Sequence, residues 1–197
     1  MRAVKRLFLL RHGSTGMDGR YVGATDLPLG GDGVADLAGT AAFLQRQEID
    51  LALCSPMRRC RETLEHLDLA CPVEIVEDLR EIDFGRWEGR SFEEICREDE
   101  KLVDKWAQAT EDFTFPQGEA VAHFALRVKR VMETLQTTSA RRPLLVTHGG
   151  VIRRLLCACL AIAPEKSLVF NVRAGRCAIV DLYPEGGVLD GLNIGGW

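Results

Sequence analysis

Two short apolar runs that each end at a histidine constrain this chain more than any other feature of its sequence. The first, at residues 7–10, leads into Arg11-His12-Gly13, and the second, at 144–146, leads into Thr147-His148-Gly149-Gly150. A buried parallel strand followed by such a turn places the histidine at the carboxyl edge of a sheet. Open α/β folds build their sites at that edge. The sequence therefore predicts two histidines at a functional edge of a sheet.

Strand and helix patterns alternate along the rest of the chain at short spacing, which favours an α/β fold with a parallel-rich sheet. Further strands are predicted at 51–54, 73–76, 144–147, 169–172 and 177–182, and helices at 31–45, from Ser55-Pro56, from 118 to 135 and at 151–160. We expect a three-layer sandwich, with a mostly parallel central sheet flanked by helices. The glycine-rich tail, 186–197, is expected to fray.

The chain is expected to form a single domain over residues 1–197. Its 197 residues are enough for one well-buried core and fall within the usual domain size. No repeat or linker divides it. The charged stretch at about 90–117 is predicted to be a helical insertion that forms part of the cover of the site.

Composition excludes several classes of partner. The net charge of −4 and the lack of a basic stripe argue against nucleic acid. No apolar run is long enough to cross a bilayer, so no membrane contact is expected. The seven cysteines are scattered and odd in number, which indicates reduced thiols and a cytoplasmic protein. We expect no metal and no cofactor; whether two copies form a homodimer through an exposed sheet end stays open.

Two histidines backed by arginines suggest phosphoryl chemistry. Hydrolysis of a phosphomonoester without a metal needs a nucleophile, cationic groups around the phosphoryl oxygens and an acid for the leaving oxygen. A neutral imidazole can attack phosphorus when its other nitrogen is held by a hydrogen bond, and His12 is well placed for this. Arg11 and the pair Arg58-Arg59, at a helix start, offer planar forks that suit phosphate. The alternative is a structural histidine and a solvated arginine pair.

The acid is harder to identify from residue chemistry. Segment 79–89 contains three carboxylates, Glu81, Asp83 and Glu88, beside the aromatic residues Phe84 and Trp87. Aromatic packing can raise the pKa of a carboxyl group towards neutrality, as general acid catalysis requires. The alternative is a polar loop held by its aromatic side chains. Composition alone does not choose among the three carboxylates.

Several of these blocks resemble, in order, the motifs of the histidine phosphatase superfamily, also called the phosphoglycerate-mutase-like family. Leu10-Arg11-His12-Gly13-Ser14-Thr15 resembles its signature, and 21–29 is similar to the branch that contains the alpha-ribazole phosphatases. Block 55–63 is similar to the second arginine motif, and the match falls on Arg59. Block 79–89 is similar to the segment that carries the acid, which the resemblance places at Glu81. The turn at 116–119 and the second histidine motif at 147–150 complete the set. The ordered set spans nearly the whole chain.

The resemblance implies a phosphoglycerate-mutase-like fold and a phosphohistidine mechanism. His12 would attack phosphorus, and Glu81 would protonate the leaving oxygen and later take a proton from water. The residues that would hold the phosphoryl oxygens are Arg11, Arg59 and His148. We further expect substrate or phosphate contacts from Tyr21, Gly23 and Gly149.

The sequence departs from the family at Asp18, where many members have an asparagine that helps to bind phosphate. A carboxylate that faces a phosphate is repelled by it, so Asp18 is not expected to be a phosphate ligand. Ser14 stands where many members of the family have glutamate, and Cys54 stands where many have serine. We expect both differences to be compatible with the fold and the site.

Three functions are compared. The first is a metal-independent phosphatase acting on a small phosphomonoester; its substrate is alpha-ribazole 5′-phosphate from cobalamin assembly or, as the alternative, a broad range of sugar phosphates. The second is a cofactor-dependent phosphoglycerate mutase, which is disfavoured because 89–118 is short and acidic. The third is a non-catalytic phospho-ligand binder. The aromatic residues that could stack on a flat base, or only pack, are Tyr21, Phe84, Trp87, Trp106 and Phe115.

Overall fold

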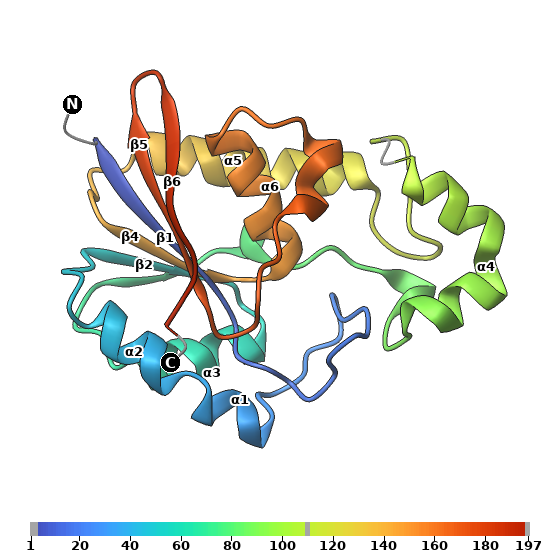
Figure 1. Cartoon of the computed structure of the whole chain (residues 1–197), viewed down its shortest axis with the longest axis horizontal. Coiled ribbons are helices and arrows are strands. Elements are labelled where there is room, and N and C mark those ends of the chain that lie inside the picture. The colour runs from blue at the N-terminus through green and yellow to red at the C-terminus, as the bar shows by residue number, and fades with distance from the viewer. Residues whose placement is uncertain (1–3, 109–110, 196–197) are drawn as a thin grey trace.

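The computed structural model describes residues 4–108 and 111–195, and its centre is a mixed β-sheet (Figure 1). The strands are β1 (Lys5–Arg11), β2 (Leu51–Cys54), β3 (Val73–Ile75), β4 (Pro143–Thr147), β5 (Cys177–Tyr183) and β6 (Gly186–Ile194). They lie in the order β3-β2-β4-β1-β5-β6. The pairs β3/β2, β2/β4 and β4/β1 are parallel, whereas β1/β5 and β5/β6 are antiparallel. The predicted parallel-rich sheet is confirmed, with an antiparallel edge.

Helices cover both faces of this sheet, which confirms the predicted sandwich (Figure 1). The α-helices are α1 (Gly31–Ala35), α2 (Ala38–Leu44), α3 (Arg58–Leu67), α4 (Phe92–Ala107), α5 (Val121–Thr137) and α6 (Gly149–Cys159). Short 3₁₀ helices occupy η1 (Glu77–Leu79), η2 (Gly85–Trp87) and η3 (Pro164–Val169). Helices α1 to α3 lie on one face and α5 and α6 on the other, while α4 stands to one side (Figure 1).

Strand β1 is the centre of the core. Its side chains alternate between the two faces of the sheet, as extended backbone requires. Leu7 and Leu9 pack in the apolar cluster shared with α5 and α6, whereas Phe8 and Leu10 pack in the cluster shared with α2 and α3. All four side chains are fully buried. The run is continuous because both faces of the strand are covered, as is typical of parallel sheets.

Two predicted elements at the C-terminal end are wrong. Segment 169–172 is not a strand: η3 ends at Val169, whose side chain is 69% exposed, and a loop follows. The second closing strand is β6, within the tail that was expected to fray. Gly187 lies so close to Cys159 O that a Cβ there would be only 2.7 Å from it. The tail is therefore glycine-rich because it packs closely; Trp197 lies outside the described residues.

The predicted helix at 31–45 is divided. Helix α1 ends at Ala35 and α2 begins at Ala38, with a turn between them. The apolar spacing continues across the break, so periodicity alone did not reveal it. Within the described ranges, no helix is both long and apolar enough to cross a membrane. All seven cysteines are free thiols.

Candidate active site

The two sequence-predicted histidines meet at the carboxyl ends of neighbouring parallel strands. Arg11 pairs in register with Thr147 across β1 and β4, and the next residue, His12, donates its backbone N–H to Thr147 O at 3.0 Å. His148 follows Thr147 directly. The two imidazole centroids are 5.1 Å apart, with the rings inclined by 63°. The sheet thus brings together two groups that are 136 positions apart in the sequence.

His12 is arranged as a neutral nucleophile. Its Nδ1 lies 2.8 Å from the carbonyl oxygen of Gly13, and because a carbonyl only accepts, Nδ1 carries the proton. The lone pair is then on Nε2, which has no hydrogen-bond partner among the described residues. Burial, followed by the charges of Arg59 and Arg11, lowers the pKa of His12 to about 3, although the Gly13 bond acts in the opposite sense. The ring is neutral at pH 7.

Arg59, near the start of α3, is the second arginine of the site. Its side chain is fully buried. It donates from Nη1 to Thr25 O at 2.8 Å, from Nη2 to Gly23 O at 2.8 Å and from Nε to His148 Nδ1 at 3.3 Å. The guanidinium plane is thus fixed by three contacts beside both histidines. The neighbouring Arg58 is exposed and pairs with Glu62.

The side chain of Arg11, the residue before His12, has an N–H donor that the described part of the protein does not use. Its Nη1 donates to Val172 O at 2.8 Å. Its Nε is buried and, within residues 4–108 and 111–195, has no hydrogen-bond partner. An unsatisfied buried N–H costs about 1–3 kcal/mol, which a bound anion would recover. Arg11 Nε also lies 3.6 Å from an ideal Cβ position on Gly149, at the start of α6, where a helix N-terminus favours negative charge.

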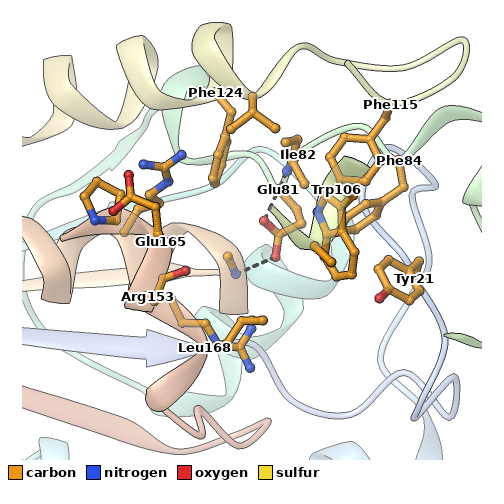
Figure 2. Close-up of a pocket in the computed structure, with 16 residues that line it drawn as sticks. Tyr21, Glu81, Ile82, Phe84, Trp106, Phe115, Phe124, Arg153, Glu165 and Leu168 are labelled. Carbon is orange, nitrogen blue, oxygen red and sulfur yellow. Dashed lines mark hydrogen bonds between the residues drawn. The ribbon is translucent and has the colours of Figure 1, made fainter. Parts of the chain in front are cut away.

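Glu81 is held against the first turn of α6. Its Oε2 accepts the backbone N–H of Gly150 at 2.8 Å, and its Oε1 accepts that of Ile82 at 3.1 Å (Figure 2). A Cβ on Gly150 would overlap Glu81 Oε1, so glycine is required for this approach. The other two candidate carboxylates are used elsewhere: Asp83 accepts from Gly85, and Glu88 binds the loop described below.

A cavity of about 440 Å³ opens beside Glu81 and is walled by aromatic side chains (Figure 2). The aromatic residues that line it are Tyr21, Phe84, Trp106, Phe115 and Phe124. Trp106 comes from α4, so the segment at 90–117 contributes to this wall. Trp87 does not line the cavity; it is 1% exposed and packs behind Tyr21 and Phe115. The charged residues Arg153, Arg154 and Glu165 also line the cavity.

Gly23 supports the site through its backbone. Its N–H donates to Glu88 Oε1 at 2.9 Å, and its carbonyl receives Arg59. Its amide is therefore committed to Glu88, in contrast to the predicted phosphate contact. A Cβ on Gly23 would overlap Ile82 O, which explains the glycine. Asp18 is exposed and accepts a hydrogen bond from Ser14 Oγ at 3.0 Å.

Sequence reasoning missed three residues that organise this region. Glu88 accepts the backbone N–H groups of Gly23, Ala24 and Thr25 and so fixes the loop that carries the Arg59 acceptors. Arg153, five positions after His148, donates to Phe170 O and lines the cavity. Ser55 lies 2.8 Å from His148. Ser55 and Glu88 lie inside the matching blocks 55–63 and 79–89, so the sequence marked their segments but not these contacts, whereas Arg153 lies outside the blocks.

No group of three or more His, Cys, Asp or Glu side chains that could hold a metal ion occurs in the described part of the chain. The chemistry available here is that of two buried imidazoles, the buried guanidinium group of Arg59, the partly buried one of Arg11, and the carboxylate of Glu81 at the wall of the cavity. Such a set can bind a tetrahedral anion and carry out attack and proton transfer without a metal.

Comparisons with known proteins agree with this geometry. A family profile described as "Histidine phosphatase superfamily (branch 1)" matches residues 7–195. The adenosylcobalamin/alpha-ribazole phosphatase of Escherichia coli K12 is 30% identical over 193 residues, covering 95% of each chain. The crystal structure of the alpha-ribazole phosphatase from Shigella flexneri superposes with a TM-score of 0.85 at 28% identity, covering 97% of each chain. A protein of Yersinia enterocolitica named "probable phosphoglycerate mutase" is 28% identical, over 89% of this chain and 84% of its own length.

Proposed function

We propose that this chain, which belongs to the histidine phosphatase superfamily (branch 1), hydrolyses a small phosphomonoester through a phosphohistidine intermediate. The observation that carries the mechanism is the neutral His12, whose Nδ1–H is held by Gly13 O and whose Nε2 is free to attack. In the first step, Nε2 forms a bond to phosphorus as the ester P–O bond breaks. In the second, water attacks phosphorus and the P–N bond breaks.

Three other residues would surround the transferring phosphoryl group. Arg11 has an unsatisfied buried N–H, and Arg59 and His148 lie beside His12 with their side chains fixed by hydrogen bonds. The guanidinium groups of Arg11 and Arg59 are donors whose positions are fixed before the reaction, and such donors stabilise the charge of the transition state without reorganisation. Glu81 would give a proton to the leaving oxygen and take one from the attacking water. Its position at the cavity wall supports this role.

The leaving alcohol would occupy the aromatic cavity, because Glu81 lines it and the leaving oxygen has to reach that carboxyl group. A volume of about 440 Å³ is within the range of small-molecule sites. Aromatic walls favour a flat, weakly charged group. We therefore propose alpha-ribazole 5′-phosphate as the leading substrate, in line with the names of the relatives. Segment 90–117, which supplies Trp106, is proposed as part of the site cover.

A mutase reaction would transfer the phosphoryl group from His12 back to a sugar acid. That reaction needs cationic groups in the leaving-group pocket for the carboxylate. The pocket does contain Arg153 and Arg154, but most of its wall is aromatic or aliphatic, and Glu165 also lines it. Hydrolysis is therefore the better supported reaction. Seven free thiols are consistent with the proposed cytoplasmic location.

The test is phosphate release from a panel containing alpha-ribazole 5′-phosphate, simple sugar phosphates and 3-phosphoglycerate, with chelator present. We expect one ester with a flat leaving group to turn over fastest, and an acid-labile phosphoenzyme to form on mixing. His12→Ala should abolish both, while His66→Ala, which removes an exposed histidine of α3, should change neither. Isomerisation of 3-phosphoglycerate without net hydrolysis would support the mutase, and equal rates for wild type and His12→Ala would refute the mechanism.

A further inference from the structure

His148 has a defined partner on each ring nitrogen. Arg59 Nε lies 3.3 Å from Nδ1, and Ser55 Oγ lies 2.8 Å from Nε2. A guanidinium group has only donors, so Nδ1 accepts. Burial, followed by the charges around it, lowers the pKa of His148 well below its usual value. In the empty site the ring is therefore neutral, and its single proton is on Nε2, which donates to Ser55.

Ser55 is itself held rigidly. It follows β2 directly, its side chain is fully buried, and its backbone N–H donates to Val146 O at 3.0 Å. Among the described residues, the other contact of His148 Nε2 is Cys60 Sγ at 3.5 Å, which is long and involves a weak acceptor. Arg59, which can only donate, selects the tautomer, and the 2.8 Å contact with Ser55 supplies the acceptor that the Nε2–H of that tautomer needs.

We propose that Ser55 is a positioning residue: it accepts the Nε2–H that Arg59 leaves on His148, stabilises that tautomer and holds the ring with Nδ1 turned towards the phosphoryl site. His12 has the opposite tautomer, because Gly13 O holds its Nδ1–H. The two imidazoles would thus present different nitrogens to the same phosphoryl group. Ser55 contacts no substrate in this scheme and acts through His148.

This orientation suits a phosphomonoester and in that respect rests on the proposed function. The second ionisation of a phosphate ester has a pKa of about 6, so a monoanion carries one P–O–H proton. A phosphoryl O–H can replace the 3.3 Å contact of Arg59 as the donor to the Nδ1 lone pair of His148, while Nε2–H stays on Ser55. The opposite tautomer would direct Nδ1–H at Arg59 Nε, which is also a donor, and would leave no lone pair on Nδ1 for that proton.

The direct test is ¹⁵N NMR of histidine-labelled wild-type protein, with His12→Asn and His148→Asn used for assignment. We expect a proton on Nδ1 of His12 and on Nε2 of His148. A proton on Nδ1 of His148 would overturn the proposal. This readout needs no substrate, so its failure is distinct from failure of the proposed hydrolysis.

Variants test the consequence for turnover. Ser55→Ala and the nearly isosteric Ser55→Cys should mix the His148 tautomers and lower kcat about 10- to 100-fold, the cost seen when the partner of a functional histidine is removed at metal sites. KM should change less than about threefold. Cys54→Ala, a buried neighbour without a contact to His148, is the matched control and should keep both the tautomer and kcat. If Ser55→Cys folds and matches Cys54→Ala in both readouts, Ser55 is not a positioning residue.

Discussion

At the scale of single residues, what matters in this site is which atoms are left free. His12 Nε2 and Arg11 Nε have no partner among the described residues, whereas Arg59 and His148 beside them are hydrogen-bonded to the protein. An incoming phosphoryl group would satisfy both. The carboxyl group of Glu81, bonded to two backbone N–H groups, is positioned beside that space.

We predict that Glu81→Gln lowers kcat about 10²- to 10⁴-fold, the usual contribution of general acid catalysis. Loss of His12 should cost more, because no other nucleophile lies beside it. The measurement is single-turnover kinetics with two esters of different leaving-group pKa. The Glu81→Gln defect should shrink for the better leaving group, and an equal defect for both esters would contradict a role as acid.

We predict that Arg59→Lys lowers kcat/KM about 10²- to 10³-fold, as for loss of one fixed charge-stabilising donor. A lysine ammonium lacks the planar fork and cannot reach Thr25 O, Gly23 O and His148 together in this geometry. The adjacent exposed residue supplies the control: Arg58→Lys should stay within about twofold. The measurement is the steady-state kcat/KM of both variants. Equal losses of kcat/KM in Arg59→Lys and Arg58→Lys would contradict the assignment of the family arginine to Arg59.

At the scale of elements, the first turn of α6 and the carboxylate of Glu81 are in close contact. Gly150 is in the first turn of α6, with its N–H on Glu81 and no room for a Cβ. The atom that blocks that Cβ is at the end of a side chain, so the carboxylate, and not the helix, is expected to move.

We predict that Gly150→Ala lowers activity without lowering the stability of the fold. Alanine within a helix is favoured over glycine by roughly 0.5–1 kcal/mol, so unfolding in urea should show equal or slightly greater stability. Displacement of Glu81 should lower kcat at least tenfold and at most by the loss predicted for Glu81→Gln. The reason is that proton transfer requires the carboxyl group to lie within hydrogen-bond distance of the leaving oxygen. Gly31→Ala, at the open first position of α1, is the control and should retain full activity. An active Gly150→Ala would contradict the coupling.

The elements that were predictable are those whose patterns are local. The apolar run of β1 and the spacing in α5 reflect burial of a strand and of one helix face, and both are visible within a few residues. Residues 169–172 have strand-like composition, but no neighbouring strand is available to them. Strand β6 was missed because close packing requires glycine there, and glycine in a tail resembles a loop.

The site was predictable only where a residue acts through its own side chain. His12, His148, Arg11 and Arg59 meet as expected from motif order. The contacts of Gly23 within the protein were not predicted: its amide binds Glu88 and its carbonyl binds Arg59, two residues far away in the sequence. Contacts between backbone and distant side chains leave no periodic signal, so no sequence pattern could have revealed them.

At the scale of the whole molecule, two neutral histidines are buried in the core of the sandwich, and this makes stability depend on pH. Both have a pKa in the folded state below the unfolded value of about 6.5, with His12 at about 3. In mild acid the unfolded chain then binds more protons than the folded one. The free energy of unfolding must fall as the pH falls below 6.5.

We predict a loss approaching 1.4 kcal/mol per pH unit for each of these histidines between about pH 5.5 and 4.5. The measurement is urea unfolding across that window for the wild type and a histidine variant, because carboxylates with lowered pKa such as Glu62 and Asp99 begin to add a loss of the same sign at its lower end. His12→Asn should reduce the slope by about one histidine equivalent. A slope unchanged by that variant would mean that His12 is protonated when folded.

The position of β1 at the centre of the sheet has a consequence for synthesis in the cell. This strand is synthesised before its two neighbours, β4 and β5, which begin only at residues 143 and 177. Until those residues have been made, four consecutive apolar side chains and two backbone edges of β1 have no strand to pair with. Such nascent segments favour chaperone binding or aggregation. The two histidines therefore cannot be brought together before β4 has been synthesised and has paired with β1.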